Sequence, residues 1–212
     1  MCVFVEGFGL TETSPFVAIL DASHAIRKNG SVGRAVMHMD VRIVDDLGQE
    51  APLGDVGELV VRGPNVMKGY WNKPAETKAA LVDGWFHTGD MARKDDEGFL
   101  YIVDRKKDMI ITGGENVYPV EVEQILFRHP LIREVAVIGV PDEQWGESVK
   151  AIVALKDDAS TLSLEELRSF CEGKLARFKM PKYLEITRSL PCNATGKVLK
   201  TVLRQNTISN LS

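Results

Sequence analysis

The sequence has few cysteines, no long apolar run and no block of charge of one sign. Its three cysteines, Cys2, Cys171 and Cys192, lie far apart and form no C-x-x-C pair. They therefore indicate neither a disulfide framework nor a zinc site, and they favour a reducing, cytoplasmic setting. No apolar run approaches the roughly 20 residues that span a bilayer, and residues 1–13 lack the pattern of a signal peptide.

The charged side chains are interleaved along the whole chain. The 26 basic and 30 acidic residues give a formal net charge of −4 without forming blocks. Nucleic acids and anionic lipids bind broad basic faces, so we predict neither as a partner. Small-molecule chemistry is the better expectation.

The first half of the chain predicts a β-rich unit. Short β-branched runs at 41–44 and 58–62 alternate with turn clusters. A short helix is expected over 73–81, a break in regular structure over 84–90, and a further strand over 98–103.

The pattern then changes to alternating helices and strands. Pro119 suits the first turn of a helix that should end near residue 129, and Ser163 with Glu166 forms a capping box before another helix. Strands are expected over 134–140, 149–155 and 183–187, a last helix over 198–204, and a frayed tail to residue 212. The sequence thus predicts two units, 1–104 and 105–212.

Thr11 and Glu12 stand side by side in a glycine-flanked segment, Gly7-Phe8-Gly9-Leu10-Thr11-Glu12-Thr13. A hydroxyl can bond a phosphate oxygen, and a carboxylate can ligate Mg²⁺. The competing interpretation is an ordinary turn.

Asp90, Arg105 and Lys197 are three further candidates. A carboxylate after Gly89 could accept two hydrogen bonds from a ribose diol, and the planar guanidinium of Arg105 could also bind ribose oxygens. An ammonium next to Gly196 could neutralise charge on a phosphate or carboxylate. Taken singly, these residues are more often part of a turn or helix cap, a solvated hairpin and a surface loop, respectively.

The order and spacing of these segments resemble the adenylate-forming superfamily, which includes acyl-CoA synthetases, luciferases and nonribosomal adenylation domains. The matching motifs are GFGLTE (7–12), GEL (57–59), GYW (69–71), GWFHTGD (84–90), DRKKD (104–108), GGENVYP (113–119) and TGK (195–197). The resemblance to the C-terminal part of an AMP-forming acyl-CoA synthetase implies an α+β fold. Residues 1–104 would be a β-rich, distorted barrel-like remnant of the large domain, and 105–212 the small mobile C-terminal domain.

Such enzymes activate a carboxylic acid with Mg-ATP to an acyl-adenylate and pass the acyl group to a thiol. By this resemblance Thr11 contacts phosphate, Glu12 binds Mg²⁺, and Asp90 with Arg105 holds the ribose of ATP or AMP. Lys197 is implied as the catalytic lysine of adenylation.

The resemblance also assigns the two steps to two orientations of the mobile domain. Lys107 takes the hinge position. A rotation there would replace Lys197 with the Gly113-Gly114 face, whose small residues let the pantetheine arm of CoA approach the backbone. A hairpin turn would require the same two glycines, so both interpretations stay open.

The Ser/Thr/Gly-rich phosphate loop of the family, which ends in Pro-Lys-Gly, is not in this sequence, so we expect the chain alone to be incomplete for catalysis. Partners would be a carboxylic acid, fatty or aryl, with ATP and CoA, and as macromolecules the absent N-terminal portion or a second copy. The alternatives are a non-catalytic nucleotide- or partner-binding protein and a piece of a nonribosomal-type adenylation domain.

Overall fold

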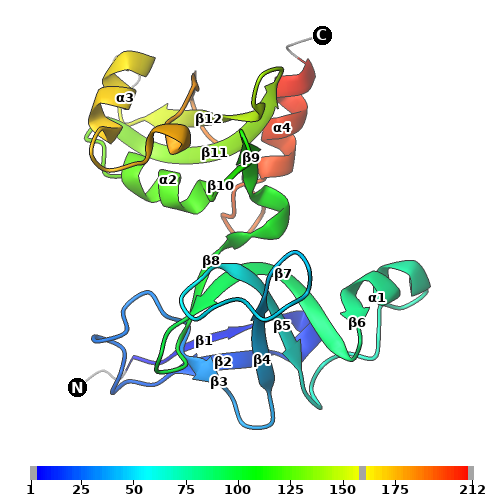
Figure 1. Cartoon of the computed structure of the whole chain (residues 1–212). Coiled ribbons are helices and arrows are strands. Elements are labelled where there is room, and N and C mark those ends of the chain that lie inside the picture. The colour runs from blue at the N-terminus through cyan, green and yellow to red at the C-terminus, as the bar shows by residue number, and fades with distance from the viewer. Residues whose placement is uncertain (1–3, 158–160, 210–212) are drawn as a thin grey trace. The chain divides into compact units, whose positions relative to one another are not determined.

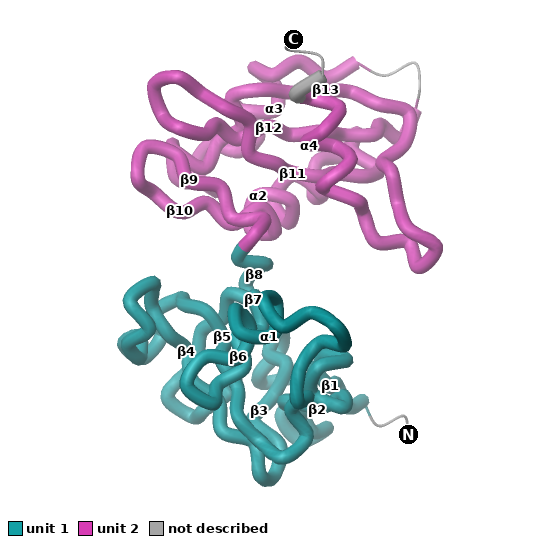
Figure 2. The backbone as a smooth tube through the Cα atoms, turned by 90° about the vertical axis from the view of Figure 1, so that its right-hand side faces the viewer, with its two compact units in different colours: residues 1–106 teal, residues 107–212 magenta. Residues whose placement is uncertain are grey.

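The computed structural model describes residues 4–157 and 161–209. The chain forms two compact units, Met1–Lys106 and Lys107–Ser212, coloured separately in Figure 2. Both combine sheets with a few short helices, which confirms the predicted α+β class. The identity of these units as the end of a large domain and a mobile domain stays a prediction.

The first unit contains two sheets in its described residues (Figure 1). A three-stranded antiparallel sheet joins β1 (Glu6–Gly9), β2 (Phe16–Leu20) and β3 (Arg34–Ala35), with the 3-10 turn η1 (Thr11–Thr13) after β1. The five-stranded sheet has the order β4-β5-β7-β6, with β8 also paired to β7. Its strands are β4 (Asp40–Val44), β5 (Gly57–Arg62), β6 (Leu81–Val82), β7 (Trp85–Lys94) and β8 (Leu100–Arg105). Over the described residues both sheets are open, and they do not close into a barrel.

The central strand β5 organises the core of the first unit. Leu59 and Val61 are fully buried, with Phe86 of β7 beside them in one apolar cluster. The run Leu59-Val60-Val61 is apolar without interruption, as expected of a strand segment that is buried on both faces. The helix expected over 73–81 forms as α1 (Pro74–Ala80), with proline in its first turn.

The predicted break at 84–90 is wrong. Residues 85–90 belong to β7, a ten-residue strand, and only Gly84 lies in the turn before it. The glycine responsible for the expectation, Gly89, has φ of 71°, and the pairing with both β5 and β8 shifts register nearby. A β-bulge accommodates the turn-forming residues without ending the strand.

The second unit is built on the long antiparallel hairpin of β11 (Ile132–Asp142) and β12 (Gly146–Leu155). β13 (Tyr183–Thr187) pairs parallel to β12, and the short hairpin of β9 (Ile110–Thr112) and β10 (Glu115–Val117) joins at Gly146. The remaining elements are the 3-10 turns η2 (Lys106–Asp108) and η3 (Arg177–Lys179) and the helices α2 (Pro119–Leu126), α3 (Leu164–Cys171) and α4 (Lys200–Ser209).

Helices cover both faces of this sheet. Side chains alternate along a strand, so Val137 packs in one apolar cluster with Leu126 and Leu167, while Ile138 packs in another with Leu203 of α4. The predicted capping box is present, because the Ser163 hydroxyl accepts from the Glu166 amide. Residues 205–209, expected to belong to a frayed tail, continue α4, and residues 210–212 lie outside the described residues.

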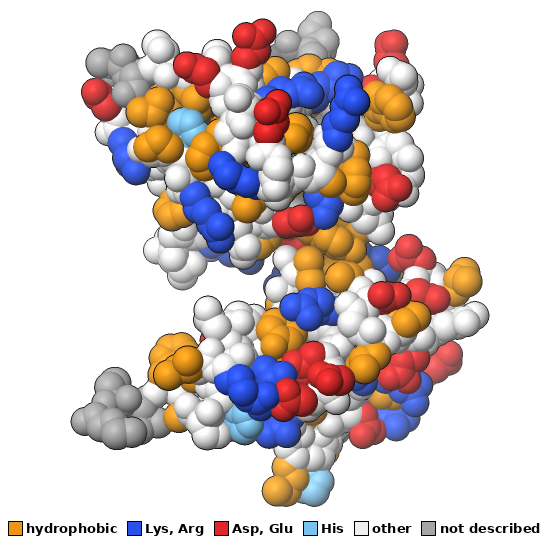
Figure 3. Space-filling view, turned by 60° about the vertical axis from the view of Figure 1, so that its left-hand side comes forward, with side chains coloured by type: hydrophobic (Ala, Val, Ile, Leu, Met, Phe, Trp, Pro, Cys, Tyr) orange, Lys and Arg blue, Asp and Glu red, His pale blue; other side chains and the backbone are white. Residues whose placement is uncertain are grey.

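Acidic and basic side chains are mixed on the surface, as their interleaving in the sequence predicts. On the face in Figure 3, acidic and basic side chains lie next to one another and form no single broad basic area. No helix within the described ranges has the length and apolar character of a membrane span.

Candidate functional site

The loop that carries Thr11 and Glu12 has a tightly defined backbone. A Cβ on Gly9 would lie 1.6 Å from the carbonyl oxygen of Pro15, so only glycine fits at the entry to the loop. The Thr13 hydroxyl donates to the Pro15 carbonyl (2.7 Å) and accepts from the Leu10 amide (3.0 Å). These contacts close the loop and leave the Thr11 side chain exposed.

Glu12 is held from the segment after β5. Its carbonyl accepts from the Met67 amide (2.8 Å), and its Oε1 accepts from the Tyr70 hydroxyl (3.0 Å). Burial and the adjacent carboxylate raise the pKa of Tyr70, which therefore stays a donor at neutral pH. The described residues contain no cluster of three metal-ligating side chains. A single carboxylate fits Mg²⁺ that is bound mainly by substrate phosphates and water.

Asp90 and Arg105 meet across β7 and β8, where they are register partners. Arg105 Nε lies 2.7 Å from Asp90 Oδ1, and the Asp90 side chain is 5% exposed whereas that of Arg105 is 42% exposed. The two residues that the family resemblance predicts to hold the ribose together are thus in direct contact. The arrangement fixes the guanidinium from its buried side and leaves its outer part open to a ligand.

Glu58 supports this pair from β5. Its carboxylate accepts from the Gly89 amide (3.2 Å) and binds Lys106 Nζ (3.0 Å) and His87 Nδ1 (3.2 Å). Burial alone would raise the pKa of Glu58, but the bonds from His87 and Lys106 outweigh it and lower the pKa. Sequence reasoning did not single out Glu58, because its partners are distant along the chain.

Lys107 is exposed and is the first residue of the second unit. It lies in η2, the turn that follows β8. The next residue, Asp108, is bound by Arg204 of α4 (2.9 Å). The residue before Lys107, Lys106, is thus bound to Glu58 of the first unit, and the residue after it, Asp108, is bound to Arg204 of the second unit.

Gly113 and Gly114 form the two-residue turn of the β9–β10 hairpin, with φ of 59° and 84°. Two positive φ values in succession are typical of a type I′ turn, which confirms the structural role considered for them. Gly113 has a second constraint. Its amide donates to the Trp145 carbonyl (2.9 Å), and a Cβ here would lie 2.8 Å from the Trp145 ring.

Lys197 ends a compact loop before α4. Asn193 Oδ1 accepts from the amides of Thr195 (3.0 Å) and Lys197 (2.8 Å), and the Asn193 amide donates to the Lys197 carbonyl (2.9 Å). The backbone at Lys197 is therefore fixed while its side chain is exposed. A long mobile ammonium on a rigid base is suited to reaching an anionic reactant.

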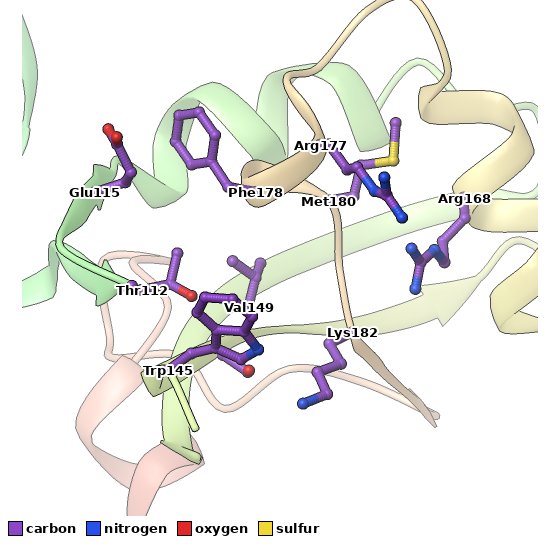
Figure 4. Close-up of a pocket in the computed structure, with 11 residues that line it drawn as sticks. Thr112, Glu115, Trp145, Val149, Arg168, Arg177, Phe178, Met180 and Lys182 are labelled. Carbon is purple, nitrogen blue, oxygen red and sulfur yellow. The ribbon is translucent and has the colours of Figure 1, made fainter. Parts of the chain in front are cut away.

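A pocket of about 510 Å³ lies in the second unit beside Gly113. Trp145 and Phe178 both line it (Figure 4), and these two residues are 48% and 41% exposed. The lining also includes three cationic residues and one acidic residue. The cations are Arg168, Arg177 and Lys182, and the acid is Glu115.

Sequence reasoning missed this pocket. Trp145 lies between the strands predicted over 134–140 and 149–155, where only a connecting turn is expected, and no sequence motif marks Phe178. Exposed large aromatics mark binding surfaces, but their exposure is not visible in the sequence. The only local signal is the cationic run Arg177-Phe178-Lys179, which also suits a solvated turn.

Comparison with known proteins places both units in one family. The sequence profile of the AMP-binding enzyme matches residues 1–71, and that of the AMP-binding enzyme C-terminal domain matches residues 121–197. The gap between the two matches includes Asp90, Arg105 and Gly113, so the profiles do not test those roles.

Curated relatives and solved structures agree. A feruloyl-CoA synthase of Amycolatopsis is 48% identical over 202 residues, covering 95% of this chain and 41% of its own length. A long-chain-fatty-acid–CoA ligase of Mycobacterium tuberculosis is 47% identical, with 95% of this chain and 39% of its own length covered. The o-succinylbenzoate-CoA synthetase of Bacillus subtilis, solved with its acyl-adenylate intermediate, has a TM-score of 0.86 at 38% identity, over 94% of this chain and 40% of that one.

The chain thus spans about 40% of the length of the relatives it matches. Its motifs predicted the relationship, and matches in both units support it. The chain belongs to the AMP-binding enzyme family, in which it matches the C-terminal part of AMP-forming acyl-CoA synthetases.

Proposed function

We propose that the full-length protein containing this sequence is an AMP-forming acid–CoA ligase. It activates a carboxylic acid with ATP to an acyl-adenylate, releases pyrophosphate, and transfers the acyl group to the CoA thiol. The names of the relatives, which include feruloyl-CoA synthase and long-chain-fatty-acid–CoA ligase, support a fatty or aryl acid as substrate.

One observation carries the proposal: each unit contains a separate group of side chains suited to a nucleotide. The first is the Asp90–Arg105 pair, and the second is the aromatic and cationic pocket at Trp145. A ligase that uses ATP and free CoA has to bind two nucleotides. A protein that only binds AMP needs one site, and a nonribosomal-type domain transfers to a carrier arm that has no nucleotide. Two sites therefore favour CoA as acceptor.

In the first unit, Asp90 and Arg105 would hold the ribose of ATP and of the adenylate. The Thr11 hydroxyl would donate to a phosphate oxygen. Glu12 would ligate Mg²⁺, which neutralises phosphate charge when bound. Tyr70 would orient the Glu12 carboxylate through its hydroxyl, 3.0 Å from Oε1.

In the second unit, Lys197 would lie between the carboxylate of the acid and the phosphate it attacks, and reduce the repulsion between the two anions. Lys107 would be the residue about which the unit rotates after adenylation. The division of the chain directly before Lys107 supports this role. Rotation would then bring the Gly113-Gly114 turn to the adenylate.

The pocket next to that turn would bind the nucleotide end of CoA. Aromatic faces such as those of Trp145 and Phe178 stack on adenine, with a contribution of about 1–3 kcal/mol per base in nucleic-acid complexes. Arg168, Arg177 and Lys182 would pair with the phosphates. Because the Gly113 amide donates to the Trp145 carbonyl, a nucleotide here would place its attached arm near the glycine turn.

Calorimetry on the 212-residue chain tests the two-site arrangement. We expect AMP and adenosine 3′,5′-bisphosphate, the nucleotide end of CoA, to bind together without displacing each other. Asp90→Asn should weaken AMP only, and Trp145→Ala should weaken the bisphosphate only. Competition between the two nucleotides would show a single site and contradict the proposal.

A turnover assay tests the expectation of incompleteness. The chain is incubated with Mg-ATP, CoA and a panel of carboxylic acids, and AMP is measured. We expect no acid-dependent AMP, because the Pro-Lys-Gly phosphate loop is not in this sequence. Acid-dependent release would overturn that expectation, and nucleotide binding without any ligase activity in the full-length protein would favour the non-catalytic alternative.

A further inference from the structure

Asp142, the last residue of β11, is placed behind the pocket. Its side chain is 5% exposed, and it is not among the residues that line the cavity. Its Oδ1 accepts from the amides of Gln144 (3.0 Å) and Trp145 (3.2 Å). Its Oδ2 binds Lys182 Nζ at 2.6 Å and accepts from the Ser148 hydroxyl.

Each oxygen of this carboxylate therefore holds a different residue of the pocket lining. Oδ1 fixes the β11–β12 turn that presents Trp145, and Oδ2 fixes Lys182, which comes from the segment before β13. Figure 4 shows Trp145 and Lys182 on the same side of the cavity. The Lys182 ammonium and the Ser148 hydroxyl hold the pKa of Asp142 well below its usual range, so the carboxylate is charged at neutral pH.

The turn that Asp142 fixes also reaches the glycine hairpin. The Trp145 carbonyl accepts from the Gly113 amide, and Glu147 Oε2 accepts from the Ile111 amide (2.9 Å). A displacement of the turn would therefore change both the aromatic wall and the position of β9. Holding such groups before a ligand arrives reduces the entropy lost on binding.

We propose that Asp142 is a positioning residue for the acceptor nucleotide, which orients Trp145 and Lys182 without touching the ligand. This role rests on the function proposed for the pocket. It differs from a merely structural turn cap, because its removal should weaken binding by the folded protein and not only its stability.

The test uses adenosine 3′,5′-bisphosphate binding to the 212-residue chain, measured by calorimetry below the melting temperature of each variant. We expect Asp142→Ala to weaken affinity by about tenfold, because it releases both the Trp145 turn and Lys182. Asp142→Asn keeps an oxygen for the Gln144 and Trp145 amides but cannot accept from Lys182. This variant should lose about threefold in affinity. In a protein that already carries Lys182→Met, Asp142→Asn should cause no further loss of affinity.

Asp95→Ala is the matched control. Asp95 Oδ1 also caps a turn, accepting from the Glu97 (3.0 Å) and Phe99 (2.8 Å) amides, and its Oδ2 also binds a lysine, Lys28 (2.7 Å). It belongs to the first unit, so its loss should lower stability and leave bisphosphate affinity within about twofold.

The outcomes separate the two proposals. If Trp145→Ala and Lys182→Met weaken binding but Asp142→Ala does not, the positioning role is overturned and the pocket stands. If neither pocket variant weakens binding, the pocket fails and the role of Asp142 fails with it. If Asp142→Ala does not fold, the double-mutant cycle of Asp142→Asn and Lys182→Met tests the proposal instead. Additive losses of affinity in that cycle would show that Asp142 does not act through Lys182.

Discussion

Arg105 Nε lies 2.7 Å from Asp90 Oδ1, and two paired strands hold both residues in register. The first unit contains a second cross-strand pair of the same type, Asp40 with Arg62 (2.9 Å), on β4 and β5. The two pairs differ in burial. The Asp40 side chain is 62% exposed, whereas that of Asp90 is 5% exposed. Only the buried carboxylate can hold its guanidinium without competition from water, since exposed pairs contribute little.

Asp90→Asn should weaken AMP binding by about tenfold, because a neutral amide neither attracts Arg105 as strongly nor accepts two ribose hydrogen bonds as well. Calorimetry on the 212-residue chain measures the affinity. Asp40→Asn removes the exposed pair and should leave AMP affinity unchanged. Equal losses in both variants would indicate a general effect of charge and contradict a specific ribose site.

Lys197→Ala, in a full-length ligase that contains this chain, should abolish pyrophosphate release from acid plus ATP, with a loss of about 100-fold or more. Conversion of supplied acyl-adenylate and CoA to thioester should persist, because the lysine is proposed to act only in adenylation. Lys156→Ala changes another exposed lysine of the second unit and should affect neither step. Equal loss of both half-reactions would refute the role given to Lys197.

Gly113→Ala should slow thioester formation from acyl-adenylate by about tenfold and leave adenylation unchanged, since its methyl group would press on Trp145. Gly173→Ala is the control. Gly173 also has a positive φ, 70°, but a Cβ there meets nothing within 4 Å. Both variants should lose about 1–2 kcal/mol of stability from the left-handed backbone, so urea unfolding separates that cost from the effect on acyl transfer. Identical kinetics in the two variants would exclude a specific role for Gly113.

His129 should make the stability of the chain pH-dependent. Burial lowers its pKa from the ordinary value of 6.5, and Lys174 and Lys156 add to this lowering while Glu166 opposes it. The unfolded chain then binds the proton more readily. The free energy of unfolding should therefore fall as pH drops below about 6.5, and level off below the folded-state pKa.

Urea midpoints at pH 7.5 and pH 5.5 test this. His129→Asn keeps an acceptor for the Leu131 amide, which now donates to Nδ1 (3.3 Å), and it should show a smaller decrease than the unchanged chain. His38→Asn replaces an exposed histidine with φ of 68°, a conformation that asparagine tolerates, and should retain the full decrease. If His129→Asn loses as much stability between pH 7.5 and pH 5.5 as the unchanged chain, groups other than His129 cause the pH effect.

Local signals predicted the elements that depend on local contacts. The helix after Ser163 begins where the capping box places it, and proline marks the starts of α1 and α2. The prediction for residues 84–90 was wrong because it also used only local signals. Their glycine and aspartate favour a turn, but Glu58 and Thr88 stabilise the bulge inside β7 through contacts with β5.

The family, the α+β class and the residues that carry the motifs could all be predicted from the sequence, because short motifs in a fixed order can be recognised without knowledge of contacts. The direct ion pair of Asp90 with Arg105, the pocket lined by Trp145, Phe178 and Lys182, and the buried side chain of Asp142 are visible only in the folded chain. Pairings of this kind depend on strand register and on burial. Both are set by the packing of segments far apart in the chain, so neither can be read from local composition.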